Sequence, residues 1–230
     1  MPKYLRPEHR LVAALLAKMD GDFLAAAHCY FGGGTQLAMS LGEYRVSRDV
    51  DFLCASRDGV RKLRETVSER SLGAVARAPL QLAREVRTDR DGIRTFIAAG
   101  DTRIKLEIVF ESRIELAGTF DKRLHVATLS PEHAVAEKFL ANADRGLDDS
   151  TLARDLIDLA FASVGFGKAT LQRGLALAEA AYGNTARRYL DQALDRFQGN
   201  RSRAAACIAS LGVQDTATLR MGLRTLRALA

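Results

Sequence analysis

Several features are scarce or missing in this sequence. No apolar run approaches the roughly 18 residues that span a bilayer, and the opening MPKYLRPEHR is charged, so we expect neither a signal peptide nor a membrane anchor. The three cysteines (Cys29, Cys54 and Cys207) are scattered and odd in number, which argues against a disulfide framework or a cysteine metal site. Internal repeats and low-complexity linkers are also absent. We therefore expect a cytoplasmic protein with reduced thiols.

The composition is that of an ordinary globular protein. The chain has 230 residues, of which 47% are hydrophobic and 27% charged, enough to bury a core in one or two domains. The formal net charge of +6 favours an anionic partner. Much of the excess comes from arginines in two segments: Arg57, Arg61 and Arg64, and Arg187, Arg188, Arg196, Arg201 and Arg203. Solvated helix faces explain these arginines equally well, so charge alone does not decide for nucleic acid.

Hydrophobic periodicity predicts an α+β fold in two parts. In the first part, we expect a helix over 10–19, a strand ending near residue 31, a helix over 35–41, a strand at DVDFLC and a helix over 57–70. A β-meander follows, in the runs LQLAREVRT, IRTFIAA and TRIKLEIVFE. The second part is helical, with segments over 130–140, 151–163, 168–182, 185–197, 201–209 and 215–230. The predicted domains are 1–127 and 128–230.

The stretch YFGGGTQLAMSLGEYRVSRDVDFLC, residues 30–54, combines a glycine corner with an Asp-x-Asp pair. Backbone N–H groups at a glycine-rich turn that enters a helix can hold a phosphate. Gly33 and Gly34 remove side chains that would block the phosphate, and Thr35 adds a hydroxyl. A plain turn is the alternative interpretation.

Asp49 and Asp51 indicate a metal site. Residues two apart on a strand point the same way, with Cα atoms about 6.6 Å apart, and can straddle two Mg²⁺ ions. Glu107, which shares a strand face with Lys105, is the candidate third carboxylate. Three such carboxylates would repel one another by about 4 kcal/mol per pair, and bound divalent cations would neutralise their negative charge. A solvent-exposed sheet face is the alternative for Asp51 and Glu107.

Four segments carry a family resemblance. The segment GGGTQLAMSLGEYRVSRDVDF resembles the Gly-Gly-Thr … Arg-x-Ser-x-Asp-x-Asp-Phe signature of the polymerase-β-like nucleotidyltransferase superfamily, and more narrowly its AbiEii/AbiGii toxin branch. IKLEIVF resembles the family's second motif, a strand that carries the third acidic residue, here Glu107. AVAEKFLANADR resembles the family's helical Glu-Lys segment, and LARDLIDLAF resembles its Asp-x-x-Asp-Leu segment. Together they cover about residues 31–161.

The resemblance implies roles for individual residues. Nucleotide binding falls to Gly33, Gly34, Thr35, Arg45, Ser47 and Lys138; catalysis to Asp49, Asp51, Lys138 and Asp155; metal binding to Asp49, Asp51 and Glu107. Lys138 would neutralise the triphosphate, and Asp155 would orient the acceptor or the lysine. The residues alone suggest less: Lys138 could be a surface lysine, and Arg154 could pair with Asp158 across one turn.

The resemblance also implies the fold and activity. We expect a nucleotidyltransferase-type mixed sheet with flanking helices, followed by a helical domain that completes the active-site cleft. With Mg²⁺ (two ions, or Mn²⁺ in their place), the enzyme would move an NMP from ATP, GTP or CTP to RNA, tRNA above all, and release pyrophosphate. It would be a bacterial toxin that an antitoxin protein holds in check, with the arginine-rich helices contacting RNA phosphates. Two alternatives remain: a catalytically silent nucleotide-binding regulatory module, and transfer to a protein or small-molecule hydroxyl.

Overall fold

The computed structural model describes residues 4–230. Their contacts group them into two compact units. The mixed unit runs up to Gln36 and resumes over Arg48–Ser130, and the helical unit comprises Leu37–Ser47 and Pro131–Ala230. The predicted boundary after residue 127 does not anticipate that residues 37–47 belong with the helices.

A seven-stranded mixed sheet forms the centre of the mixed unit, in the order β3-β4-β5-β2-β1-β7-β6. The pairs β2–β5 and β1–β7 are parallel and the others antiparallel. The strands are β1 (Cys29–Gly32), β2 (Val50–Cys54), β3 (Leu82–Thr88), β4 (Gly92–Ala99), β5 (Thr102–Phe110), β6 (Gly118–Asp121) and β7 (Val126–Leu129). The meander predicted over 80–111 is confirmed as β3, β4 and β5.

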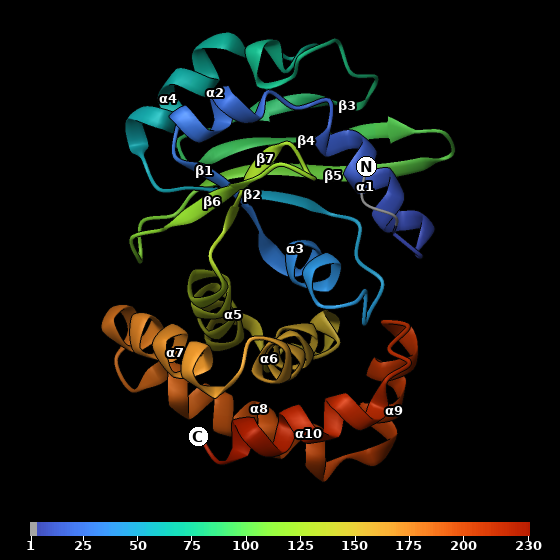
Figure 1. Cartoon of the computed structure of the whole chain (residues 1–230), viewed down its shortest axis with the longest axis vertical. Helices are drawn as coiled ribbons and strands as arrows, with labels where there is room; N and C mark the ends of the chain where they lie inside the picture. Colours follow the sequence, from blue (N-terminus) through green and yellow to red (C-terminus); the bar gives the residue numbers. More distant parts are fainter. Residues whose placement is uncertain (1–3) are drawn as a thin grey trace. The chain divides into compact units, whose positions relative to one another are not determined.

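Helices cover one face of this sheet. They include α1 (Pro7–Leu16), α2 (Gly21–Ala26) and α4 (Arg57–Thr66), with a 3-10 turn η1 (Gly73–Val75). In Figure 1, α2 and α4 lie on the same side of the strands, in agreement with the contacts of α2 with β1 and β7 and of α4 with β2 and β5. Helix α4 begins where Ser56 Oγ accepts a hydrogen bond from Gly59 N at 3.0 Å.

Alternation along β2 and β5 separates the core from a more open face. On one side lie buried apolar residues, which make up the core of the unit: Val50, Phe52, Cys54, Ile104, Leu106 and Ile108. Asp51, Lys105 and Glu107 lie on the other side and are only partly buried. The prediction that Lys105 and Glu107 share a strand face is therefore confirmed.

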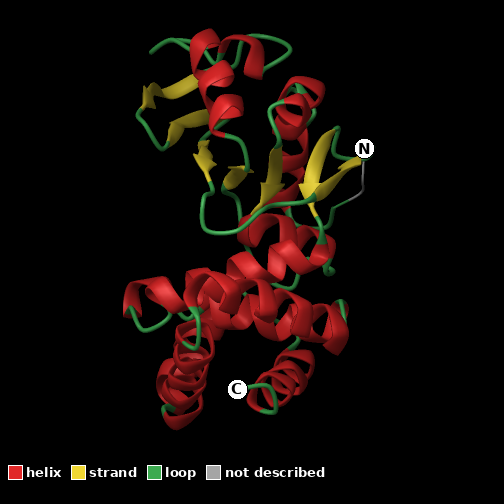
Figure 2. Cartoon of the chain, turned by 90° about the vertical axis from the view of Figure 1, so that its left-hand side faces the viewer, coloured by secondary structure: helices red, strands yellow, loops and turns green. Residues whose placement is uncertain are grey.

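The helical unit contains no strand among the residues that the structure describes, and Figure 2 shows it as helices joined by loops. Its helices are α5 (Pro131–Arg145), α6 (Arg154–Gly165), α7 (Lys168–Tyr182), α8 (Thr185–Gly199), α9 (Arg201–Ser210) and α10 (Thr216–Arg227), with a 3-10 turn η2 (Asp149–Thr151). Helix α5 packs against α6, α7 and α8, and α6 packs against α10. Helix α3 (Gly33–Ser40) starts in the mixed unit and ends in the helical one.

Two further observations concern the sequence predictions. Between residues 4 and 230, no helix has both the length and the apolar character to cross a membrane. The three cysteines are buried and free.

Candidate functional site

The glycine corner holds its backbone directly against the first strand aspartate. Gly32 and Asp51 are register partners on β1 and β2, and α3 begins at Gly33. Gly33 has a φ of +70°, and a Cβ built on it would lie 2.6 Å from Asp51 Oδ2. Only glycine combines this left-handed backbone with so close an approach. The corner thus brings the start of a helix next to a carboxylate.

Two of the three predicted metal-binding carboxylates lie side by side on the sheet. Asp51 and Glu107 are register partners on the parallel strands β2 and β5, so they share a face as neighbours. Asp49 immediately precedes β2 and is half-buried. Thr35 is buried in the first turn of α3. The structure therefore groups Asp51 and Glu107 with the glycine corner.

Glu107 has cationic neighbours on its own face. Its carboxylate accepts from Lys105 Nζ at 2.5 Å and lies 3.3 Å from Arg94 Nε. Over residues 4–230, no group of three or more His, Cys, Asp and Glu side chains is arranged to hold a metal ion. The Asp49 and Asp51 carboxylates supply the hard oxygen ligands that Mg²⁺ prefers, so this pair fits the ion chemically. The metal role of Glu107 stays a prediction.

A second group of predicted residues lies in the helical unit, around a fully buried carboxylate. Asp158 Oδ1 accepts from Tyr44 Oη at 2.7 Å and from Arg45 Nε at 2.6 Å. Asp158 Oδ2 accepts from Arg45 Nη2 at 2.9 Å and lies 2.8 Å from Lys138 Nζ. The suggested pairing of Asp158 with Arg154 is wrong, because the carboxylate is turned into the unit toward Arg45 and Lys138.

Asp155 extends this cluster. It accepts from Lys138 Nζ at 2.8 Å and from Arg145 Nε at 2.8 Å. Leu152 and Ala153, immediately before α6, have φ angles of 55° and 52°. Non-glycine residues in this region each cost about 1 kcal/mol or more, and they start α6 so that Asp155 falls in its first turn. We refer to Tyr44, Arg45, Lys138, Arg145, Asp155 and Asp158 as the ionic cluster.

Charge balance explains how these groups remain ionised in the interior. Burial works to raise the pKa of Asp158, but attraction to Arg45 and Lys138 outweighs it and holds the pKa below its usual value. The pKa of Asp155 is lowered in the same way: burial opposes the shift, while Lys138 and Arg145 cause it. Burial also works to lower the pKa of Lys138, and the two aspartates reverse this. Two buried cations, Arg45 and Lys138, thus face two buried anions.

The burial of Lys138 bears on its expected role. Only 4% of the residue is exposed, so the interpretation as a surface lysine is wrong. Arg45 is equally buried, at 4%, while Ser47 is half-buried. The Lys138 ammonium contacts two carboxylates, Asp155 Oδ1 and Asp158 Oδ2, each at 2.8 Å.

Sequence reasoning assigned no function to three members of the ionic cluster. Tyr44 and Asp158 are 114 positions apart, and nothing in the sequence indicates their contact. Arg145 follows Lys138 by seven residues, so the helical spacing on α5 could have placed both on one face. For Asp158, the one sign in the sequence was its spacing from Asp155, since residues three apart lie on the same face of a helix.

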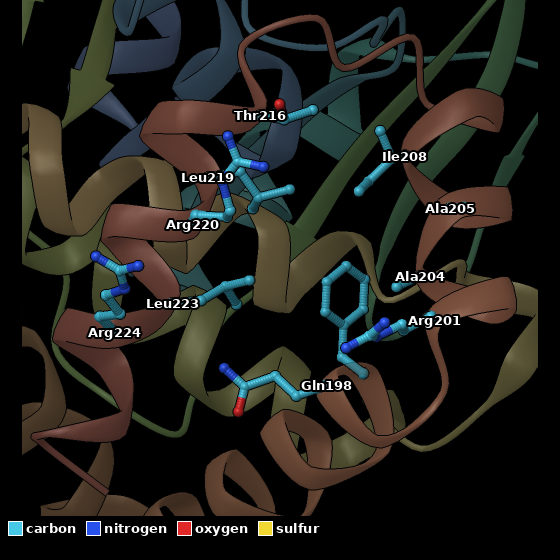
Figure 3. A pocket seen from close by; sticks show the side chains of 11 residues that line it. Gln198, Arg201, Ala204, Ala205, Ile208, Thr216, Leu219, Arg220, Leu223 and Arg224 are labelled. Carbon is cyan, nitrogen blue, oxygen red and sulfur yellow. The ribbon is translucent and has the colours of Figure 1, made fainter.

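A separate pocket lies in the helical unit between α8, α9 and α10 (Figure 3). Its volume is about 650 Å³ and its apolar lining includes Phe197, Leu219 and Leu223. Arg220 and Arg224 project from α10 beside it. None of the predicted site residues lines this pocket.

Comparison with known proteins identifies a family that matches most of the chain. The profile of the family described as "Nucleotidyl transferase AbiEii toxin, Type IV TA system" matches residues 14–226. Comparison with curated proteins gives no match.

Two solved structures share the fold. JHP933 from Helicobacter pylori has a TM-score of 0.54 and 16% identity, over 98% of this chain and 93% of that one. A "putative nucleotidyltransferase from H. pylori" has a TM-score of 0.53 and 17% identity, over 99% and 95%. The predicted α+β fold of nucleotidyltransferase type is thereby confirmed. With the family match over nearly its full length, this chain belongs to the AbiEii nucleotidyltransferase toxin family of type IV toxin–antitoxin systems.

Proposed function

We propose that this protein transfers a nucleotidyl group from an NTP to an RNA hydroxyl, with tRNA as the foremost acceptor. The observation that carries the proposal is the approach of Gly33 to the Asp51 carboxylate, with Asp49 two residues earlier. A phosphate-binding turn and acidic ligands side by side are what a nucleoside triphosphate with its divalent cation requires.

The glycine corner would hold the β- and γ-phosphates. Helix α3 begins at Gly33, so the backbone N–H groups of its first turn have no partner within the helix and carry the positive end of its dipole. Gly33, which is only partly buried, and Gly34 carry no side chain that would block a phosphate oxygen, and the Thr35 hydroxyl would add a polar group. These residues would align the triphosphate for in-line attack.

Asp49 and Asp51 would hold Mg²⁺, or Mn²⁺ in its place, with Glu107 as a further candidate ligand. The bound ions would supply positive charge that activates the acceptor hydroxyl and stabilises the pyrophosphate leaving group. The carboxylates themselves keep that charge in position relative to the glycine corner. Arg94 and Lys105 hold the Glu107 side chain on the same sheet face.

The ionic cluster would act through Lys138. In this role the ammonium neutralises triphosphate charge, and Asp155 orients the lysine through its 2.8 Å contact. Arg45 and Ser47 would contribute further nucleotide contacts. The buried partners keep Lys138 charged, which is a precondition for binding a phosphate.

As a type IV toxin, the protein has an antitoxin as its counterpart, and we propose that toxicity follows from modified RNA in the cytoplasm. The direct test incubates the protein with Mg²⁺, total RNA and each labelled NTP in turn, and follows label on a gel. Label in an RNA band with one NTP supports the proposal. Label only in protein or in a small molecule refutes the RNA acceptor.

A nucleotide-binding module without catalysis is the second candidate. It is favoured by the pairing of Glu107 with Arg94 and Lys105, since a carboxylate held by two cations is less available to a metal. Calorimetric titration with NTP, with and without Mg²⁺, separates the two. Binding without any label transfer to RNA, protein or small molecules would favour the silent module.

A further inference from the structure

The sheet face that carries Asp51 also carries a group of cations on β3, β4 and β5, three adjacent strands (Figure 1). Because the opposite face packs into the core, residues of β4 and β5 alternate between buried side chains and this face. An irregularity in the register of β3 puts Arg84 and Arg87, three residues apart, on this same face. The cations on the face are Arg84, Arg87, Arg94, Arg103 and Lys105. We call these residues, together with Phe96, the basic sheet face.

Strand register connects this face to the candidate catalytic carboxylate. Arg87 pairs with Arg94, Arg94 with Glu107, and Glu107 with Asp51. Register partners share a face, so the four side chains form one row across four strands. Three strand spacings of about 4.8 Å make the row roughly 14 Å long at the backbone. A polyanion that follows the row from the sheet edge therefore arrives at Asp51.

An aromatic ring lies among the cations. Phe96 on β4 pairs with Arg84 on one neighbouring strand and with Lys105 on the other. Its side chain is half-buried although it lies on the open face, where the alternation favours polar residues. Aromatic rings flanked by cations on a sheet stack unpaired bases while the cations contact the phosphates.

Charge pairing distinguishes this face from the arginine-rich helices. Among residues 4–230, Arg84, Arg87 and Arg103 are exposed and form no ion pair. By contrast, Arg196 and Arg203 pair with Asp149. Further arginines of the helices are also paired, Arg187 with Glu179 and Arg61 with Asp58 and Glu65. Within the part of the chain that the structure describes, four of the eight helical arginines that the sequence suggested for RNA are thus ion-paired, whereas Arg84, Arg87 and Arg103 on the sheet are not.

We propose that the basic sheet face binds a single-stranded segment of the RNA acceptor and leads its reactive end to Asp51. Arg84, Arg87 and Arg103 contact phosphates, and Phe96 stacks on a base. An unpaired segment is required because bases within a duplex are not available for stacking on a flat sheet. The identity of the reactive end rests on the proposed nucleotidyl transfer, whereas RNA binding by this face does not.

The test measures binding of a fluorescent single-stranded oligoribonucleotide by anisotropy, without NTP, over a range of salt concentrations. The variant Arg84→Gln/Arg87→Gln/Arg103→Gln removes three charges from the face. The matched control, Arg70→Gln/Arg173→Gln/Arg220→Gln, removes three exposed charges from positions outside the sheet. The slope of log binding constant against log salt concentration is negative, and each phosphate contact contributes about 0.7 to its magnitude. We therefore expect this magnitude to decrease by about 2 in the face variant and to stay unchanged in the control.

Phe96→Leu tests the stacking contact separately. Loss of one stacked base should weaken RNA binding about tenfold and leave the salt slope unchanged. Circular dichroism and NTP titration of each variant verify that the fold and the nucleotide site are intact. Equal loss of RNA binding in the control, no loss in the face variant, or loss of NTP binding in the face variant would each overturn the proposal.

The outcome separates this inference from the proposed function. Face-dependent RNA binding in a protein that transfers no label would support the inference and refute the transferase. Label transfer to RNA that is equally efficient in the wild type and the face variant would support the transferase and overturn the inference.

Discussion

Replacing Asp158 by asparagine tests the ionic cluster. The carboxylate is fully buried and is contacted by Tyr44 Oη, by two nitrogens of Arg45 and by Lys138 Nζ, all between 2.6 and 2.9 Å. The amide keeps the size but removes the charge, so Arg45 and Lys138 are left with Asp155 as their only buried anion in the cluster. Breaking a buried pair in this way costs about 3–5 kcal/mol. That is a large part of the roughly 5–15 kcal/mol that stabilises a typical protein.

The assay is urea unfolding followed by far-UV circular dichroism, with Asp195→Asn as the matched control. Asp195 also pairs with an arginine, Arg227, but is 69% exposed, so its loss should cost less than about 1 kcal/mol. Tyr44→Phe, which removes one hydroxyl from the cluster, should cost about 1 kcal/mol. If Asp158→Asn lowers the free energy of unfolding no more than Asp195→Asn does, the buried charges are not what holds this part of the unit together.

Three further predictions follow from the two groups of residues. Gly33→Ala should reduce label transfer about a hundredfold, because the added Cβ would displace the Asp51 carboxylate. The control Gly100→Ala is also at positive φ but has open space around it, so it should lose only about 1 kcal/mol of stability. Equal label transfer by the two variants would refute the role of the glycine corner. Lys138→Ala should weaken NTP binding measured by calorimetry, and unchanged affinity would remove Lys138 from the nucleotide site. Folding lowers the pKa values of Asp155 and Asp158, so the stability they contribute is complete above their pKa in the unfolded chain, about 3.9, and is lost as the pH falls below it. In urea unfolding, the free energy of unfolding should therefore fall more steeply with decreasing pH for the wild type than for Asp158→Asn.

The long helices with a clear hydrophobic period could be predicted from the sequence. The predicted helix over 168–182 coincides with α7, and the helices over 185–197 and 201–209 agree with α8 and α9 within two residues. The strands β6 and β7 were missed, because each has four residues, too few for an alternating pattern to stand out. Local periodicity also cannot show that residues 37–47 pack with helices that begin only at Pro131.

The candidate site divides in the same way. The glycine corner and the Asp-x-Asp pair are close in sequence, so their spacing predicts a phosphate and metal site, with a plain turn and an exposed sheet face as the alternatives. The ionic cluster depends on contacts between residues more than a hundred positions apart, such as Arg45 with Asp158. Their pairing is decided by tertiary packing, and the local alternative, Arg154 with Asp158, was the only one that helical spacing could suggest.

Label transfer by the wild type and by Asp51→Asn, under identical conditions, tests the central claim most directly. Both proteins are incubated with Mg²⁺, total RNA and the labelled NTP that the wild type uses, after their unfolding curves have been matched. The account predicts label in RNA with the wild type and none above background with Asp51→Asn, because the amide removes a metal ligand from beside Gly33. Equal labelling by the two proteins would contradict the assignment of Asp51 and the catalytic role of the glycine corner.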